Sequence, residues 1–245
     1  MQESESSVFP ETADIETSSD GYASRFAGPV GAWMLARQER IVRDFLHAAQ
    51  TRTILDVGGG HGQLARPLAS TGYDVTVLGS AESCRARIAD LADAGHCRFV
   101  VGNVVALPFP DRAFDAVVSV RLLPHCGRWP ELIRELCRVA RNVVVVDYPV
   151  ASGLNAMAPW LFAAKQRMEK NTRTWRNFSH DEVAHAFGEA HYAPIARRGQ
   201  FLWPMVVHRT AKCPALSATL EWLPDSLGLT RRFGTPVLAA FRRET

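Results

Sequence analysis

Short strand-like runs alternate with longer stretches of helical period along most of this chain. The strand-like runs, most of them rich in valine, leucine and isoleucine, occupy residues 54–57, 74–78, 97–101, 114–120, 142–147, 194–203 and 235–241. Continuous apolar runs of this length are typical of strands buried on both faces of a parallel sheet. Apolar residues recur at helical spacing near 31–49, 64–69, 80–93 and 129–139. The alternation predicts an α/β fold whose seven-stranded, mostly parallel sheet carries helices on both faces.

The turn after the first predicted strand is the most informative part of the chain. Four glycines fall within five positions between the strand and the following helical period: Gly58, Gly59, Gly60 and Gly62. Glycine permits positive φ angles and places no Cβ atom between the backbone and a ligand. A strand that ends in such a turn and continues into a helix is typical of nucleotide sites at the carboxyl edge of a sheet.

The spacing of these glycines separates the kinds of nucleotide site. Gly58, Gly60 and Gly62 read G-x-G-x-G, and Gln63 stands where a dinucleotide site would have its third glycine. This spacing disfavours an NAD-dependent oxidoreductase. No Gly-Lys-Ser or Gly-Lys-Thr follows, so a phosphate-binding Walker loop is excluded.

The segment 55–62, Leu-Asp-Val-Gly-Gly-Gly-His-Gly, resembles the first motif of class I S-adenosylmethionine-dependent methyltransferases. The resemblance implies a Rossmann-like fold in which the glycine turn wraps the methionine part of the cofactor. It also implies that Asp56 helps to hold the cofactor amino group, directly or through water. A side chain in place of Gly60 is expected to occupy ligand space, and His61 is a second candidate for the site as a contact close to the backbone.

A second block, Gly102–Asp115, strengthens the resemblance. Its sequence Gly-Asn-Val-Val-Ala-Leu-Pro-Phe-Pro-Asp-Arg-Ala-Phe-Asp is similar to a motif of the type 11 branch, which methylates small molecules and lipids. The resemblance implies that Asn103, where relatives have aspartate, meets the adenine amino group, since its side chain keeps a carbonyl acceptor. It also implies that Val104 packs near the adenine ring.

The end of the second predicted strand departs from the family pattern. Relatives have an acid there that accepts hydrogen bonds from both ribose hydroxyls, whereas this chain has Leu78 followed by Gly79. A leucine side chain cannot accept a hydrogen bond. Glu82 could substitute for the acid, but a glutamate near a helix start is also explained by the helix dipole.

Three further residues are candidates for the site. In many relatives the segment before the first strand covers the cofactor, which would let Tyr22 and Arg25 reach the cofactor carboxylate. The alternative is that these two residues only fix a helix start. His125 follows the fourth predicted strand at the edge where ligands bind in open α/β sheets, so it is a candidate general base. A packing role is the alternative for His125 as well.

The domain organisation follows from composition. Residues 1–20 carry six acidic side chains and no basic one, which predicts a disordered acidic leader before a methyltransferase domain at 21–245. Removing these six charges from the formal net charge of +3 leaves about +9 on the remainder. This balance suits an anionic partner, although the cations are spread out and are equally consistent with a solvated surface.

Two insertions are expected in the second half of the chain. Residues 151–192 interleave aromatic and cationic side chains, which could form a nucleic-acid surface or a cap over the active site. We favour a helical cap that builds part of a hydrophobic acceptor pocket. A second helical insertion is expected at 204–230.

The remaining signals concern metals, cysteines and location. The five cysteines are scattered without a C-x-x-C pair, so we expect buried thiols rather than disulfides or a zinc site, and no metal is assigned. Neither a signal peptide nor a membrane-spanning apolar run is present in the sequence, so a cytoplasmic protein is expected.

These observations predict direct transfer of the methyl group of S-adenosyl-L-methionine to a small-molecule or lipid-like acceptor. If the acceptor is a hydroxyl, His125 is the expected base, whereas an amine or carbanion needs none. The first alternative is a partner protein with weak or no catalysis, which Leu78 favours. A nucleic-acid methyltransferase is disfavoured, because residues 119–124 lack the Asn/Asp-Pro-Pro-Tyr element of the amino-methylating enzymes.

Overall fold

A single mixed sheet of seven strands organises the part of the chain that the computed structural model describes, residues 9–150 and 175–244. The strand order is β3-β2-β1-β4-β5-β7-β6. The first five strands are parallel, and β7 is antiparallel to both β5 and β6. The strands are β1 (Thr53–Val57), β2 (Asp74–Gly79), β3 (Arg98–Val101), β4 (Phe114–Ser119), β5 (Ala140–Tyr148), β6 (Tyr192–Phe201) and β7 (Thr235–Arg243). The predicted seven-stranded, mostly parallel α/β sheet is confirmed.

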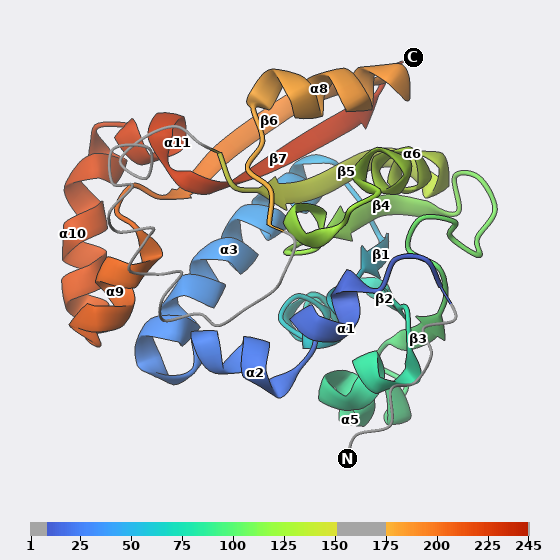
Figure 1. Cartoon of the computed structure of the whole chain (residues 1–245), viewed down its shortest axis with the longest axis horizontal. Coiled ribbons are helices and arrows are strands. Elements are labelled where there is room, and N and C mark those ends of the chain that lie inside the picture. Colours follow the sequence, from blue (N-terminus) through green and yellow to red (C-terminus); the bar gives the residue numbers. More distant parts are fainter. Residues whose placement is uncertain (1–8, 151–174, 245) are drawn as a thin grey trace.

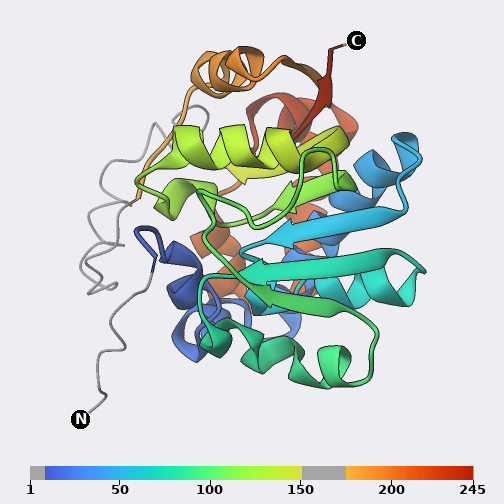
Figure 2. The same cartoon turned by 90° about the vertical axis from the view of Figure 1, so that its right-hand side faces the viewer.

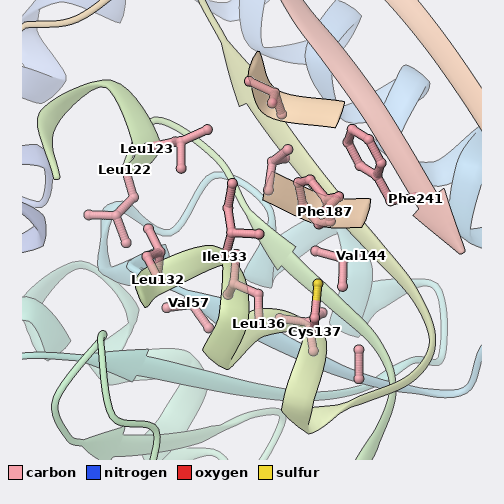
Figure 3. Packing of buried hydrophobic residues seen from close by; sticks show 14 of the residues in the cluster. Val57, Leu122, Leu123, Leu132, Ile133, Leu136, Cys137, Val144, Phe187 and Phe241 are labelled. Atoms are coloured by element: carbon pink, nitrogen blue, oxygen red, sulfur yellow. The ribbon is translucent and has the colours of Figure 1, made fainter. Parts of the chain in front are cut away.

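One face of the sheet is covered by α6 (Trp129–Val139) and α8 (His180–Glu189), which lie beside each other in Figure 1. Both helices turn their apolar side chains toward β4, β5 and β7, as Figure 3 shows for Ile133, Leu136 and Phe187. The Phe187 ring stacks on Phe241 of β7 with ring centroids 3.7 Å apart. This face therefore forms a continuous apolar core that fixes the central strands.

The opposite face is covered by α3 (Gly28–Ala48) and α4 (Ala65–Ser70). In α3, Ile41, Val42, Phe45 and Leu46 are buried at helical spacing against the valines of the sheet. The stretch after β2 differs from the single helix that the sequence predicts. It forms a 3₁₀ segment, η3 (Glu82–Ile88), which passes into the short helix α5 (Ala89–Asp93).

The N-terminal region is folded over the edge of the sheet where the parallel strands end (Figure 2). It contains α1 (Ala13–Thr17), α2 (Asp20–Ala23) and the 3₁₀ turn η1 (Ser24–Phe26). The prediction of a disordered leader was therefore wrong from Ala13 onward. Asp14 and Thr17 are buried, because this short helix packs on the glycine turn and on η3. Composition alone did not reveal these tertiary partners.

Three helices lie between β6 and β7 in the sequence: α9 (Met205–Ala211), α10 (Pro214–Ser226) and α11 (Leu229–Phe233). They are joined by the fully buried carboxylate of Glu221. This carboxylate accepts hydrogen bonds from the amides of Leu202 and Trp203 and from Thr230 Oγ1, and it lies 3.0 Å from His208 Nε2. A buried carboxylate with several partners is a stable connector between helices.

The predicted cap is described only in part. Residues 151–174 lie outside the described residues, and α8, within the predicted cap, packs on the sheet as a regular helix between β5 and β6. Four cysteines are buried free thiols and Cys213 is an exposed one. Among the described residues, the helices lack the combination of length and apolar character that crossing a membrane would require.

Candidate functional site

The glycine turn has the geometry that only glycine adopts easily. Gly58 has φ 75° and Gly62 has φ 73°, both in the left-handed region, and they flank the 3₁₀ turn η2 (Gly59–His61). The Gly58 amide donates a 2.8 Å hydrogen bond to the Leu78 carbonyl, which ties the turn to the end of β2. The backbone is thus held in a defined curve at the carboxyl ends of β1 and β2.

Two further glycines are needed for close packing. A Cβ atom on Gly59 would lie 2.1 Å from Oδ2 of Asp56. A Cβ atom on Gly60 would lie 2.4 Å from the Cys84 carbonyl oxygen and 2.7 Å from Ser18 Oγ. The structure therefore explains the need for glycine at position 60 differently from the sequence analysis. A side chain there would collide with η3 and with the residue that caps the end of α1.

Asp56 is the most unusual ionisable group of the turn. It is fully buried at the end of β1, and neither carboxylate oxygen has a hydrogen-bond partner in the part of the chain that the structure describes. Burial raises the pKa of this carboxyl to about 7. An ionised carboxylate in such a place needs a cationic or N–H partner, which a ligand can provide.

His61 connects the glycine turn to β4. Its Nε2 lies 3.3 Å from the Val120 carbonyl oxygen, and the Gln63 amide donates to its Nδ1 at 3.3 Å. These two contacts correspond to one neutral tautomer with the proton on Nε2. Burial, together with the charge of Arg121, lowers the pKa of His61 to about 3. His61 is therefore a neutral connector near the backbone.

The carboxylate nearest the tip of β2 comes from the N-terminal segment. Asp14 accepts hydrogen bonds from the Ser80 amide at 2.6 Å and from Ser80 Oγ at 2.5 Å, and it is fully buried. Leu78 is buried in the apolar core, and the side chain of Glu82 is 74% exposed beside Arg85. Glu82 thus lies away from the site, whereas Asp14 places a carboxylate there that sequence analysis missed.

The predicted adenine contacts lie just after β3. The Asn103 side-chain carbonyl accepts a 3.0 Å hydrogen bond from the Val105 amide, and a second lone pair remains for a ligand. Val104 is fully buried in the same apolar cluster as Leu78. Gly79 is buried as well, and a Cβ atom there would lie only 2.7 Å from Cys84 Cβ. The roles of these residues stay predictions.

Tyr22, Arg25 and His125 are brought together at the end of β4. The ring of His125, in the 3₁₀ turn η4 (Leu123–His125), lies edge-on to Tyr22 at 6.2 Å and to Trp175 at 5.2 Å. The guanidinium of Arg25 lies 5.2 Å from the Tyr22 ring centroid. His125 and Tyr22 are both less than one-tenth exposed, so their rings are shielded from water and form part of an aromatic cluster beside the glycine turn.

A buried polar cluster that sequence analysis missed lies where β4 and β5 end. The Arg121 amide donates to Oδ1 of Asp147 at 2.6 Å, and its Nη2 donates to Oε1 of Gln38 at 3.2 Å. Gln38 in turn donates to Oδ2 of Asp147 at 3.4 Å. All three residues are less than one-tenth exposed. Asp147, an acid at the end of a buried apolar strand, was the sequence signal for this cluster.

Burial shifts both charged members of this cluster toward neutrality. It raises the pKa of Asp147 to about 6, although the N–H group and the charge of Arg121 act in the opposite direction. It lowers the pKa of Arg121 to about 10, an effect that the charges of Tyr22 and Asp147 oppose and that of Arg209 increases. The guanidinium thus stays charged at neutral pH at a cost in solvation.

Comparison with known proteins agrees with this geometry. The family model described as a methyltransferase domain matches residues 55–144, which include the glycine turn and the second block. A demethylmenaquinone methyltransferase from Renibacterium salmoninarum is 31% identical over 119 residues, 46% of this chain and 48% of the relative. A malonyl-(acyl-carrier protein) O-methyltransferase from Pectobacterium atrosepticum is 28% identical over 191 residues, 76% of this chain and 72% of the relative.

A solved structure shares the fold over nearly the whole chain. Magnesium protoporphyrin IX methyltransferase from Synechocystis with bound SAH has a TM-score of 0.60, covers 93% of this chain and 96% of its own, and is 13% identical. At that identity the likeness concerns the fold alone. The chain spans between a fifth and about half of the length of the first three curated relatives.

Proposed function

We propose that this chain is a class I S-adenosylmethionine-dependent methyltransferase that transfers the methyl group of that cofactor to a small-molecule acceptor, a proposal that the match of residues 55–144 to a methyltransferase-domain model supports. The observation that carries the proposal is the buried carboxylate of Asp56, which has no hydrogen-bond partner among the described residues and lies behind a turn whose flanking glycines have left-handed φ angles. A cofactor with a positively charged amino group supplies the partner that this carboxylate lacks.

The residues present fit the cofactor. Asp56 would hold its amino group, and the curved backbone of Gly58 to Gly62 would lie along its methionine part. Tyr22 and Arg25 lie at the same edge of the sheet and would serve its carboxylate. When bound, S-adenosylmethionine supplies a methyl group that its positive sulfur has already activated.

The other end of the cofactor would face the tips of β2 and β3. Asn103 keeps a lone pair for the adenine amino group, and Leu78 provides an apolar surface beside it. Asp14 would bring a carboxylate to the tip of β2, where the strand itself ends in Leu78 and Gly79. The N-terminal segment thus adds polar groups that the strand lacks.

The protein's own contribution to methyl transfer would be to orient the acceptor and to exclude water. Tyr22, His125 and Trp175 form an aromatic surround next to the turn, as an apolar or planar acceptor requires. If the acceptor is a hydroxyl, an imidazole nitrogen of His125 would take its proton. A small-molecule or lipid-like acceptor is also consistent with relatives named for demethylmenaquinone and malonyl-(acyl-carrier protein).

One observation supports a second candidate, a methyltransferase-fold partner protein that binds the cofactor weakly. The helix α1 packs directly on the glycine turn, with Ser18 against Gly60 and Asp14 against Gly58. Arg87 holds this segment by donating to the Ser18 carbonyl oxygen and by pairing with Asp20. Cofactor entry would then require this segment to shift.

Calorimetric titration with S-adenosylmethionine, S-adenosylhomocysteine and NADH distinguishes the candidates. Micromolar or tighter binding of the first two, without binding of NADH, is the expected result. Saturation by NADH alone would indicate an oxidoreductase. Absence of binding by all three would favour the partner protein and contradict the proposed function.

A further inference from the structure

Arg121 has features that a purely structural arginine does not need. It is the second residue after the end of β4, it has a left-handed φ of 67°, and it is 7% exposed. A non-glycine residue in this conformation is strained, and such residues are enriched at functional sites. Its Nη1 is buried and has no hydrogen-bond partner among the described residues. Two charged N–H donors are therefore desolvated and left unused.

The contacts of Arg121 hold it toward α3 and the end of β5, while its charge also acts on His61 of the glycine turn. Its amide is held by Asp147 at the end of β5, and its Nη2 reaches Gln38 on α3. Its guanidinium lies over the ring of Phe26, 3.7 Å from the centroid. The glycine turn follows β1, the neighbour of β4 on the other side. The guanidinium thus lies in the half of the edge that remains for the acceptor.

The charge at this place suits an anion. Arg209 lies on the same Phe26 ring, 5.5 Å from its centroid, and its charge lowers the pKa of Arg121. Within the part of the chain that the structure describes, the charges of Asp147 and the Tyr22 phenol act to raise the Arg121 pKa. The Phe26 ring packs on one face of the guanidinium, and a carboxylate matches the spacing of arginine N–H donors.

We propose that Arg121 binds a carboxylate group of the acceptor. This inference rests on the proposed methyl transfer and specifies its substrate class as a carboxylate-bearing small molecule. Gln38 and Asp147 position the guanidinium, and Phe26 supports it from one face. The carboxylate satisfies the Nη1 donors and replaces the solvation that burial removes from the guanidinium.

A pair of probes that differ in charge tests the proposal. Protein saturated with S-adenosylhomocysteine is titrated with benzoate and with benzamide, which have nearly the same shape. The wild type is expected to bind benzoate at least tenfold more tightly than benzamide. Arg121→Gln is expected to lose at least tenfold in benzoate affinity and less than twofold in benzamide affinity.

Two more variants keep the test decisive. Arg121→Gly suits a φ of 67°, so it removes the guanidinium from a backbone that glycine adopts readily. Arg121→Gly should therefore lose at least tenfold in benzoate affinity, as Arg121→Gln does. Arg40→Gln removes an exposed arginine of α3 and should change neither affinity. An equal loss of benzoate affinity in Arg40→Gln would show a general charge effect and overturn the proposal.

The outcomes separate this inference from the proposed function. Equal affinity of the wild type for benzoate and benzamide, or benzoate binding unchanged in both Arg121 variants, would overturn it. A tenfold loss of S-adenosylhomocysteine affinity in Arg121→Gly would assign the guanidinium to the cofactor carboxylate and overturn it too. If the wild type does not bind S-adenosylhomocysteine, the proposed function itself has failed.

Discussion

Replacing Asp56 by asparagine changes one buried charge with almost no change in shape. In the wild type this carboxyl has a pKa of about 7 in the folded state, because burial disfavours its ionised form, against an ordinary value of 3.8. A raised folded-state pKa means that folded protein holds the proton more tightly. The stabilisation is therefore present at low pH and is lost as the pH rises from about 4 to about 7.

The magnitude follows from the interval between the two pKa values. Each pH unit in that interval is worth about 1.4 kcal/mol, so the two units between pH 5 and pH 7 amount to about 3 kcal/mol. The asparagine amide adds a cost of its own, but this cost does not depend on pH. The expected result is that the wild type loses about 3 kcal/mol more than Asp56→Asn between pH 5 and pH 8.

Urea denaturation of both proteins at pH 5 and pH 8, without cofactor, measures this difference. Asp115→Asn is the matched control, at the opposite edge of the sheet. Partial burial raises the Asp115 pKa, but hydrogen bonds from the Thr53 and Arg52 amides outweigh it, so its pKa is lowered. Asp115→Asn should therefore match the wild type in its change between the two pH values. If Asp56→Asn and the wild type lost the same free energy of unfolding between pH 5 and pH 8, the reasoning would be refuted.

The same variant tests the binding role of Asp56. A hydrogen bond to a charged group is worth about 1.5–3 kcal/mol, so Asp56→Asn should bind S-adenosylhomocysteine about 10- to 100-fold more weakly. Wild-type affinity should rise with pH through about 7, as the carboxylate becomes ionised, whereas the variant should lack this rise. Equal affinities at pH 8 would show that the cofactor does not use this carboxylate.

Three other substitutions, one of them with a matched control variant, test separate parts of the structure. Asp14→Asn removes a charged acceptor from Ser80 and should lower the free energy of unfolding by about 1–3 kcal/mol in urea, whereas no loss would mean that this contact is not formed in solution. Phe187→Ala removes a stacked core ring and should lower the free energy of unfolding by about 3–5 kcal/mol. Trp222→Ala, the control at an exposed ring, should change the free energy of unfolding by no more than about 0.5 kcal/mol. With a hydroxyl acceptor, His125→Gln should lower kcat about 10²- to 10⁴-fold without changing S-adenosylhomocysteine affinity, and an unchanged kcat would exclude it as the base.

The strands were predictable because each is a buried apolar run with a local signal. The run 142–147, for example, corresponds to β5, which extends by two residues at its start and one at its end. The glycine turn was predictable for a related reason, since positive φ angles at Gly58 and Gly62 require a residue type that is visible in the sequence. The strands and the glycine turn were therefore predictable from local conformational requirements alone.

The missed residues depend on partners that are distant in the sequence. Asp14 lies in an acidic, polar segment, and its burial results from contacts with Ser80 and Cys84, more than sixty positions away. Arg121 lies in a loop without periodicity, and its left-handed backbone is held by Asp147 rather than by a glycine. Composition and periodicity do not report such long-range pairs, so this part of the site required the structure.

The most direct test of the account is the position of S-adenosylhomocysteine in a crystal grown with it. The account predicts that its amino group lies within hydrogen-bonding distance of Asp56 and that its chain follows the backbone of Gly58 to Gly62. It also predicts that the ribose lies at the tip of β2, beside Leu78. A ligand bound elsewhere, with Asp56 still unpartnered, would contradict the proposed cofactor site.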